Sequence, residues 1–87
     1  MKIVFAGTPA NAAQTLRALA TSPFEVVAVL TRTDAPVGRK RILTPSAVAE
    51  VAAELAIPTI KANRVDEAVR ERLRDSGAEL GVIVAYG

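Results

Sequence analysis

The first nine residues constrain the fold of this chain more than any other segment. Residues 2–6 form a short segment, apolar from Ile3 onward, that leads into Gly7, and Thr8 and Pro9 follow. An apolar run of this length predicts a buried strand, and the glycine marks the turn behind it. Thr8 and Pro9 supply an N-cap and first-turn signal for a helix. The segment therefore predicts the opening strand, turn and helix of a βαβ unit.

The rest of the chain repeats this alternation of apolar runs and amphipathic segments. Further strands are predicted at residues 25–31, 57–60 and 80–85. Three helices are predicted from apolar residues at helical spacing, namely Ala12, Leu16, Leu19 and Ala20, then Val48, Val51, Ala52 and Leu55, then Val69 and Leu73. Alternating strands and helices favour an α/β fold, here a Rossmann-like doubly wound parallel sheet with its first four strands in the order 3-2-1-4.

Turn and cap residues refine these boundaries. Thr44-Pro45 repeats the cap-plus-proline signal for the second helix, Asp66 predicts the N-cap of the third, and Gly77 predicts its C-terminal turn. Pro58 places the strand at 57–60 near its start or at a sheet edge, because proline cannot donate to a ladder. The apolar strand at 80–85 is left with an open edge, which predicts poor solubility, self-association or a missing partner.

Composition excludes several classes of site. The chain has 87 residues, enough for one small domain, and contains neither Cys nor His. Disulfide scaffolds, thiolate metal sites and His-based catalytic triads therefore cannot be built from it alone. Hydrophobic residues make up 51% of the chain and aromatic residues only 3%, so the core must consist of aliphatic side chains. The first apolar run is too short for a signal peptide or a membrane span, which favours a cytoplasmic protein.

The segment from residue 32 to 44 has no periodicity and carries the chain's excess of positive over negative charge. Arg32, Arg39, Lys40 and Arg41 stand there against a single Asp34. Such a cluster can contact phosphates, although it can equally be a solvated surface loop. No aromatic residue interleaves the cations, which favours contact with a nucleic-acid backbone over base stacking.

Two short motifs flank the expected ligand crevice. The Gly7-Thr8-Pro9 turn can present helix amides to an anion or carboxylate, or can simply turn and cap the chain. It lacks the glycine fingerprint of dinucleotide sites, because Pro9 and Ala12 stand at the later glycine positions. Tyr86-Gly87 follows the last strand, where the ring can line the crevice or pack in the core.

Five segments together closely resemble the start of the methionyl-tRNA formyltransferase family. They are residues 5–9, 29–39, 43–46, 57–58 and 84–87, in the order and spacing of that family over the whole chain. The most specific part is the loop of form T-R-x-D-x-P-x-G-R followed by L-x-P-S. Departures stand at Ala10 and Asn11, where an acidic residue and Phe are common, at Lys40 in place of a glycine, and at Ala47 in place of a proline.

This resemblance implies a cytoplasmic enzyme that transfers a formyl group from 10-formyltetrahydrofolate to the amino group of methionyl-initiator tRNA, without a metal. It implies substrate contacts from Gly7, Thr8, Pro9, Tyr86 and Gly87, and tRNA contacts from Arg32, Arg39, Lys40 and Arg41. The family's catalytic Asn, His and Asp and its C-terminal tRNA-binding domain follow the region matched here. Residues 1–87 are therefore expected to form the N-terminal portion of a formyltransferase domain, inactive alone and without a catalytic residue of their own.

Two other functions remain open from the residues themselves. A stand-alone RNA-binding module would use the basic loop at residues 32–41 and would bind no folate. A nucleotide-binding half-domain would bind a mononucleotide at Gly7-Thr8-Pro9, which the missing glycine fingerprint disfavours.

Overall fold

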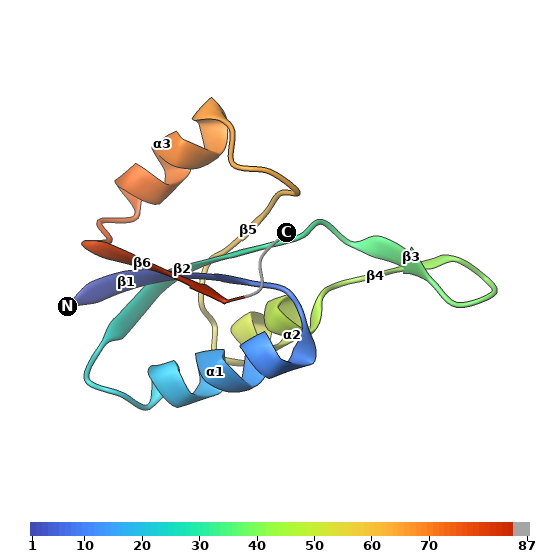
Figure 1. The fold of residues 1–87 in the computed structure, drawn as a ribbon, viewed down its shortest axis with the longest axis horizontal. Helices are drawn as coiled ribbons and strands as arrows, with labels where there is room; N and C mark the ends of the chain where they lie inside the picture. The colour runs from blue at the N-terminus through green and yellow to red at the C-terminus, as the bar shows by residue number, and fades with distance from the viewer. Residues whose placement is uncertain (85–87) are drawn as a thin grey trace.

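A four-stranded parallel sheet with helices on both faces forms the body of the molecule in a computed structural model that describes residues 1–84 (Figure 1). The sheet contains β1 (Lys2–Gly7), β2 (Glu25–Thr31), β5 (Thr59–Lys61) and β6 (Leu80–Val84). The helices are α1 (Ala10–Ala20), α2 (Ala47–Glu54) and α3 (Glu67–Asp75). A separate antiparallel hairpin of β3 (Ala35–Val37) and β4 (Ile42–Thr44) extends away from the body.

The order of the main sheet confirms the predicted topology. The strands lie in the order β5-β2-β1-β6, and every neighbouring pair is parallel. Phe5 at the centre of β1 lies opposite Val29 of β2 and Val82 of β6. Pro58 directly precedes the edge strand β5, as its missing N–H group requires. The predicted end of the last strand at residue 85 lies outside the described residues.

The larger part of the core lies between the sheet and the pair of helices α1 and α2. Its fully buried members include Leu16, Val29 and Val48, and also Phe5, so the core contains an aromatic ring although the composition predicted aliphatic side chains. Burial of each such side chain contributes about 1.5–3 kcal/mol relative to exposure. Ala20 is exposed although the spacing predicted it on the inner face of its helix. This face of the sheet is well covered by helices of the described chain.

Within residues 1–84, the opposite face is covered by α3 alone. Its buried cluster consists of Ala6, Leu30, Ile60 and Val69, and Leu73 packs against it while partly exposed. Asp66 begins α3 as predicted, because its carboxylate accepts a hydrogen bond from the N–H group of Val69 at 2.9 Å. The face is therefore held by a single helix with a short apolar stripe.

The observed N-caps of the first two helices differ from the predicted ones. Helix α1 begins at Ala10 with Pro9 as N-cap, and Thr8 does not cap it, because the Thr8 hydroxyl is buried without a hydrogen-bond partner in the described chain. Helix α2 is capped by Ser46, whose hydroxyl accepts from the N–H group of Ala49 at 3.0 Å. Thr44 belongs to β4 instead, and its hydroxyl donates to the carbonyl of Ile42.

The C-termini of the second and third helices differ in the residue that ends them. Gly77 follows α3 with φ at +79°, as its predicted place requires. Ala56 takes the corresponding left-handed place after α2, with φ at +57°. The N–H groups of Ala56 and Ile57 donate to the carbonyls of Ala53 and Ala52, which closes a Schellman turn without glycine.

The segment predicted as an irregular loop contains the β3–β4 hairpin. Ala35 pairs with Thr44, and Val37 pairs with Ile42. Both strands are only three residues long, and Pro36 lies within one of them, so period-two alternation is too short to detect.

None of the described helices has the length and apolar character that a membrane crossing demands.

Candidate functional site

The turn after β1 lies at the edge of the sheet where parallel strands end. Gly7, the last residue of β1, is buried and lies opposite Val84, the last residue of β6. Helix α1 begins three residues later at Ala10, so its N-terminus lies at the same edge. Ligands of open α/β sheets bind at this edge, and helix N-termini there favour anionic groups.

Thr8 gives this turn an unusual polar atom. The Thr8 hydroxyl is buried and has no hydrogen-bond partner within residues 1–84. An unpartnered buried hydroxyl costs about 1–3 kcal/mol, and buried polar groups in proteins nearly always have a partner. Of the predicted substrate contacts, Gly7, Thr8 and Pro9 lie together in this turn, whereas Tyr86 and Gly87 lie outside the described residues.

A buried pair of hydroxyl groups holds the two ends of the hairpin segment together. The hydroxyl of Thr31, at the end of β2, lies 2.5 Å from the hydroxyl of Ser46, the N-cap of α2. Both residues are at most 1% exposed. Because one hydrogen bond joins the residues before and after the hairpin, the base of the hairpin is fixed to the core.

Arg32 lies at the base of the hairpin and does not join the other predicted cations. Its Nη1 donates to the carbonyl of Thr33 at 2.9 Å and to that of Thr44 at 3.1 Å. The guanidinium thus bridges the chain that enters the hairpin and the chain that leaves it. Arg32 is half-buried, in contrast to the exposed residues at the tip.

Two further contacts tie the hairpin base to β5 and the segment behind it. The carboxamide oxygen of Asn63 accepts hydrogen bonds from the N–H and hydroxyl groups of Thr33, at 3.1 and 3.2 Å. Lys61 forms an ion pair with Asp34 at 2.8 Å. Sequence reasoning did not single out Ser46, Asn63 or Lys61, since their partners are 15 to 30 residues away.

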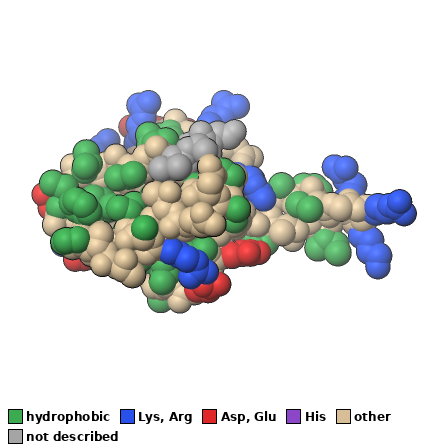
Figure 2. All heavy atoms as spheres, turned by 60° about the horizontal axis from the view of Figure 1, so that its bottom comes forward, with side chains coloured by type: hydrophobic (Ala, Val, Ile, Leu, Met, Phe, Trp, Pro, Cys, Tyr) green, Lys and Arg blue, Asp and Glu red, His purple; other side chains and the backbone are tan. Residues whose placement is uncertain are grey.

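The tip of the hairpin gathers three of the four predicted cations. Arg39, Lys40 and Arg41 are exposed, and none of them forms an ion pair within the described chain. Gly38 and Arg41 adopt positive φ angles of 78° and 50°, and the N–H group of Arg41 donates to the carbonyl of Gly38. Figure 2 shows these side chains at the end of an arm that projects from the body.

Exposed apolar side chains lie on the same arm, behind the cationic tip. Val37, Ile42 and Leu43 are 52%, 62% and 66% exposed. The arm therefore has a positively charged tip and an exposed apolar stem.

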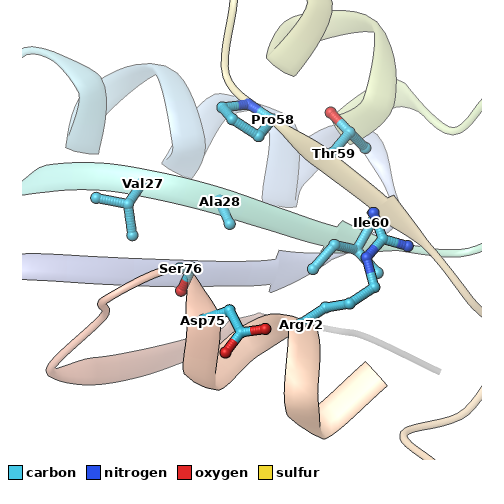
Figure 3. Close-up of a pocket in the computed structure, with 8 residues that line it drawn as sticks. All are labelled: Val27, Ala28, Pro58, Thr59, Ile60, Arg72, Asp75 and Ser76. Atoms are coloured by element: carbon cyan, nitrogen blue, oxygen red, sulfur yellow. The ribbon is translucent and has the colours of Figure 1, made fainter. Parts of the chain in front are cut away.

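A recess of about 450 Å³ lies away from both the turn after β1 and the hairpin (Figure 3). Val27 and Ala28 of β2, Pro58 and residues at the start of β5 line it from one side, while Arg72 and Asp75 face it from the last turn of α3. Helix α3 runs back from the ligand-binding edge, so this recess lies toward the amino ends of the strands.

No cluster of three metal-ligating His, Cys, Asp or Glu side chains is present in the described chain.

Comparison with known proteins decides the family. The sequence profile described as formyl transferase matches residues 1–87, the entire chain. This chain belongs to the formyl transferase family. Its match to the family covers both the turn after β1 and the hairpin, so both candidate sites belong to the matched region.

Three curated relatives of this chain share one name. The methionyl-tRNA formyltransferases of Clavibacter sepedonicus and Leifsonia xyli subsp. xyli are 58% and 59% identical to this chain over 87 residues. That of Acidothermus cellulolyticus is 50% identical over 88 residues. Each match covers 100% of this chain, and the chain spans 28% of the length of the first two relatives.

A solved structure shares the fold of this chain. The phosphoribosylglycinamide formyltransferase of Bacillus halodurans superposes with a TM-score of 0.66 over 99% of this chain and 45% of its own. Its sequence identity to this chain is 14%, so the likeness establishes the fold alone.

Proposed function

We propose that this chain is the N-terminal portion of a methionyl-tRNA formyltransferase. The parent enzyme transfers a formyl group from 10-formyltetrahydrofolate to the amino group of methionine on initiator tRNA, in the cytoplasm. The observation that carries this proposal is the 58% identity over all 87 residues to a curated protein of that name. The shared fold alone does not identify the acceptor, because formyltransferases with different acceptors share it.

We assign tRNA contact to the tip of the hairpin. Arg39, Lys40 and Arg41 are exposed and unpaired within the described chain, so their charges are available to phosphates. The anchored base supports this role, because a fixed arm loses less conformational entropy on binding than a free loop. Arg32 is assigned a positioning role, since its guanidinium already bridges two carbonyls of the hairpin.

We assign substrate contact to the turn after β1. Helix α1 points its N-terminus at this edge, and the unpartnered Thr8 hydroxyl can donate to or accept from a polar group of the ligand. Tyr86 and Gly87 complete the proposed substrate contacts on the strength of the family resemblance.

Formyl transfer itself requires groups that these 87 residues do not supply. The acceptor nitrogen forms a bond to the formyl carbon, the bond from that carbon to N10 of the folate breaks, and the amine proton passes to N10. A positioned base and a polarising donor speed such a step. The chain contains no His, and its proposed role is to bind and orient the two substrates while the following part of the enzyme performs the proton transfer.

A chimera tests this proposal. Residues 1–87 would replace the matched region of the Clavibacter sepedonicus relative, and formylation of methionyl-initiator tRNA with 10-formyltetrahydrofolate would be measured. We expect activity within about tenfold of the relative, and no activity from residues 1–87 alone. A folded chimera without formylation would contradict the proposed function.

The alternative of a stand-alone RNA-binding module receives no support from the relatives described above, all of which are named as formyltransferases. Salt-sensitive tRNA binding by the 87 residues, with the chimera inactive, is the result that would favour it.

A further inference from the structure

Three consecutive residues lead into the hairpin, and each of them is held by a different partner. Arg32 reaches across to the chain that leaves the hairpin, whereas Thr33 and Asp34 contact the end of β5 and the segment behind it. Strand β3 begins directly afterwards at Ala35. The direction in which the arm leaves the body is therefore set within these three residues.

The contact made by Asn63 differs from the other two because it holds the main chain of the arm from outside the arm. Its carboxamide oxygen accepts hydrogen bonds from both the N–H and the hydroxyl group of Thr33, at 3.1 and 3.2 Å. Since one donor is a backbone N–H group, rotation of the Thr33 side chain cannot release the arm. Asn63 thus restrains the path of the backbone itself.

Asn63 lies where β2 and β5 part. The last pair of their ladder is Thr31 with Lys61, and the N–H group of Ala62 donates to the carbonyl of Thr31 at 2.9 Å. Beyond this point the first chain runs into the hairpin and the second runs toward α3 (Figure 1). The side chain of Asn63 keeps the two segments in contact after their backbones have begun to diverge.

The neighbouring ion pair is the weaker restraint. The side chains of Lys61 and Asp34 are 42% and 36% exposed. An exposed pair of this kind contributes little to stability, and salt weakens it further. Asn63 is therefore the principal link between the entry to the arm and the end of β5.

The length of the arm magnifies any change of angle at its base. Extended chain from Thr33 to Gly38 at the tip spans about 16 Å, at roughly 3.3 Å per residue. A rotation of about 20° at the base then moves the tip by about 6 Å, which exceeds the reach of a charge-assisted hydrogen bond, about 3 Å. Contact between the tip and a phosphate thus depends on a fixed base.

We propose that Asn63 is a positioning residue that fixes the direction of the hairpin arm and so places its cationic tip for contact with tRNA phosphates. Its effect on tRNA binding is exerted through Thr33. The inference rests on the proposed contact between the tip and tRNA. A tip that is already in place loses less conformational entropy on binding, so the contribution of Asn63 appears in affinity.

Binding of initiator tRNA to the chimera, measured at several salt concentrations, tests this role. Asn63→Ala should weaken binding about fivefold, through the loss of both hydrogen bonds. The slope of log affinity against log salt should stay unchanged, because every cation of the tip remains. Hydrogen exchange of the β3 and β4 amides should become faster in the same variant.

The matched control is Gln14→Ala. Gln14 and Asn63 are both exposed, and each substitution removes one carboxamide, but Gln14 lies on α1 away from the hairpin base. Gln14→Ala should leave affinity and exchange unchanged. Circular dichroism would establish that both variants keep the native helix content.

Two further variants separate positioning from a general structural effect. Asn63→Asp keeps an acceptor oxygen for both Thr33 donors, so it should bind within about twofold of the unsubstituted chimera at the highest salt, where its added charge is most screened. Thr33→Val, added to Asn63→Ala, should cause no further loss, because the partner of the removed hydroxyl is already absent.

Three results would overturn the proposal. These are unchanged affinity in Asn63→Ala, a reduced salt slope in that variant, and no recovery of affinity in Asn63→Asp. A failure of the proposed tip contact is recognised separately, because replacement of Arg39, Lys40 and Arg41 by Ala would then leave tRNA binding unchanged. That result would overturn both proposals, whereas a weakened tip variant beside an unaffected Asn63→Ala would overturn the role of Asn63 alone.

Discussion

The hydroxyl groups of Thr31 and Ser46 lie 2.5 Å apart in the core, although 15 residues separate them in the chain. The residues between them form the projecting hairpin. One buried hydrogen bond therefore closes the insertion at its base and also fixes Ser46, which caps α2. The arm that carries the cationic tip is in this way connected to the packing of the sheet.

Replacement of Ser46 by Ala should destabilise the chain by about 2 kcal/mol. The substitution removes an N-cap, which costs about 1 kcal/mol, and leaves the Thr31 hydroxyl buried without its partner. Urea denaturation followed by circular dichroism measures the change. Thr44→Ala is the control, because the Thr44 hydroxyl bonds only locally, and it should cost less than about 0.5 kcal/mol. Equal losses in both variants would contradict the assignment of Ser46 as the cap.

Replacement of Ala56 by Gly should stabilise the chain by about 1 kcal/mol. Ala56 is exposed and held at a φ of +57°, where a Cβ atom costs about 1–2 kcal/mol and glycine pays no such strain. Gly77→Ala is the converse test at the end of α3, where φ is +79°, and it should destabilise by a similar amount. Thermal unfolding of both variants measures whether Ala56→Gly raises and Gly77→Ala lowers the stability. A loss of stability in Ala56→Gly would refute the argument from backbone strain.

Replacement of Thr8 by Val should stabilise the isolated chain by about 1 kcal/mol, since it exchanges an unpartnered buried hydroxyl for a methyl group of similar shape. The same substitution in the chimera should lower formylation activity, because the bound substrate loses the Thr8 hydroxyl as a hydrogen-bond partner. Denaturation and activity are measured on separate proteins, so the two effects are independent. A stabilised chimera with unchanged activity would remove Thr8 from the substrate site.

Replacement of Arg32 by Ala should loosen the hairpin without changing the charge at its tip. Loss of both hydrogen bonds from Nη1 should speed hydrogen exchange of the β3 and β4 amides roughly tenfold or more. Arg39→Ala is the matched control, because Arg39 is exposed at the tip, and exchange in the strands should stay unchanged. Similar exchange in both variants would mean that Arg32 does not hold the base.

Replacement of Arg39, Lys40 and Arg41 by Ala should weaken tRNA binding and reduce its salt dependence. Each lost phosphate contact lowers the slope of log affinity against log salt by roughly one. Arg70, Arg72 and Arg74 on α3 are also exposed, and their triple Ala variant removes the same charge as a control. Binding to initiator tRNA, measured on the chimera at several salt concentrations, distinguishes a local contact from a general effect of net charge. Equal weakening in both triple variants would contradict the assignment of the tip.

The sequence by itself determined the order of the strands, the three helices and the family. Apolar runs and helical spacing are local signals, and right-handed crossovers leave few ways to assemble them, so the order β5-β2-β1-β6 follows. Asp66 and Gly77 were equally predictable, because cap chemistry at these positions involves only residues within three or four positions of the helix ends.

Only the tertiary structure decided how the candidate sites are held. The pairing of Thr31 with Ser46, the bridge from Arg32 to Thr44 and the contact between Thr33 and Asn63 all join residues far apart in sequence. The hairpin strands are too short for a period to appear. The predicted Thr8 cap was wrong, because Pro9 is the N-cap of α1 and the buried Thr8 hydroxyl has no hydrogen-bond partner within residues 1–84. Such contacts depend on which elements the fold brings together, and no local pattern of residues encodes that proximity.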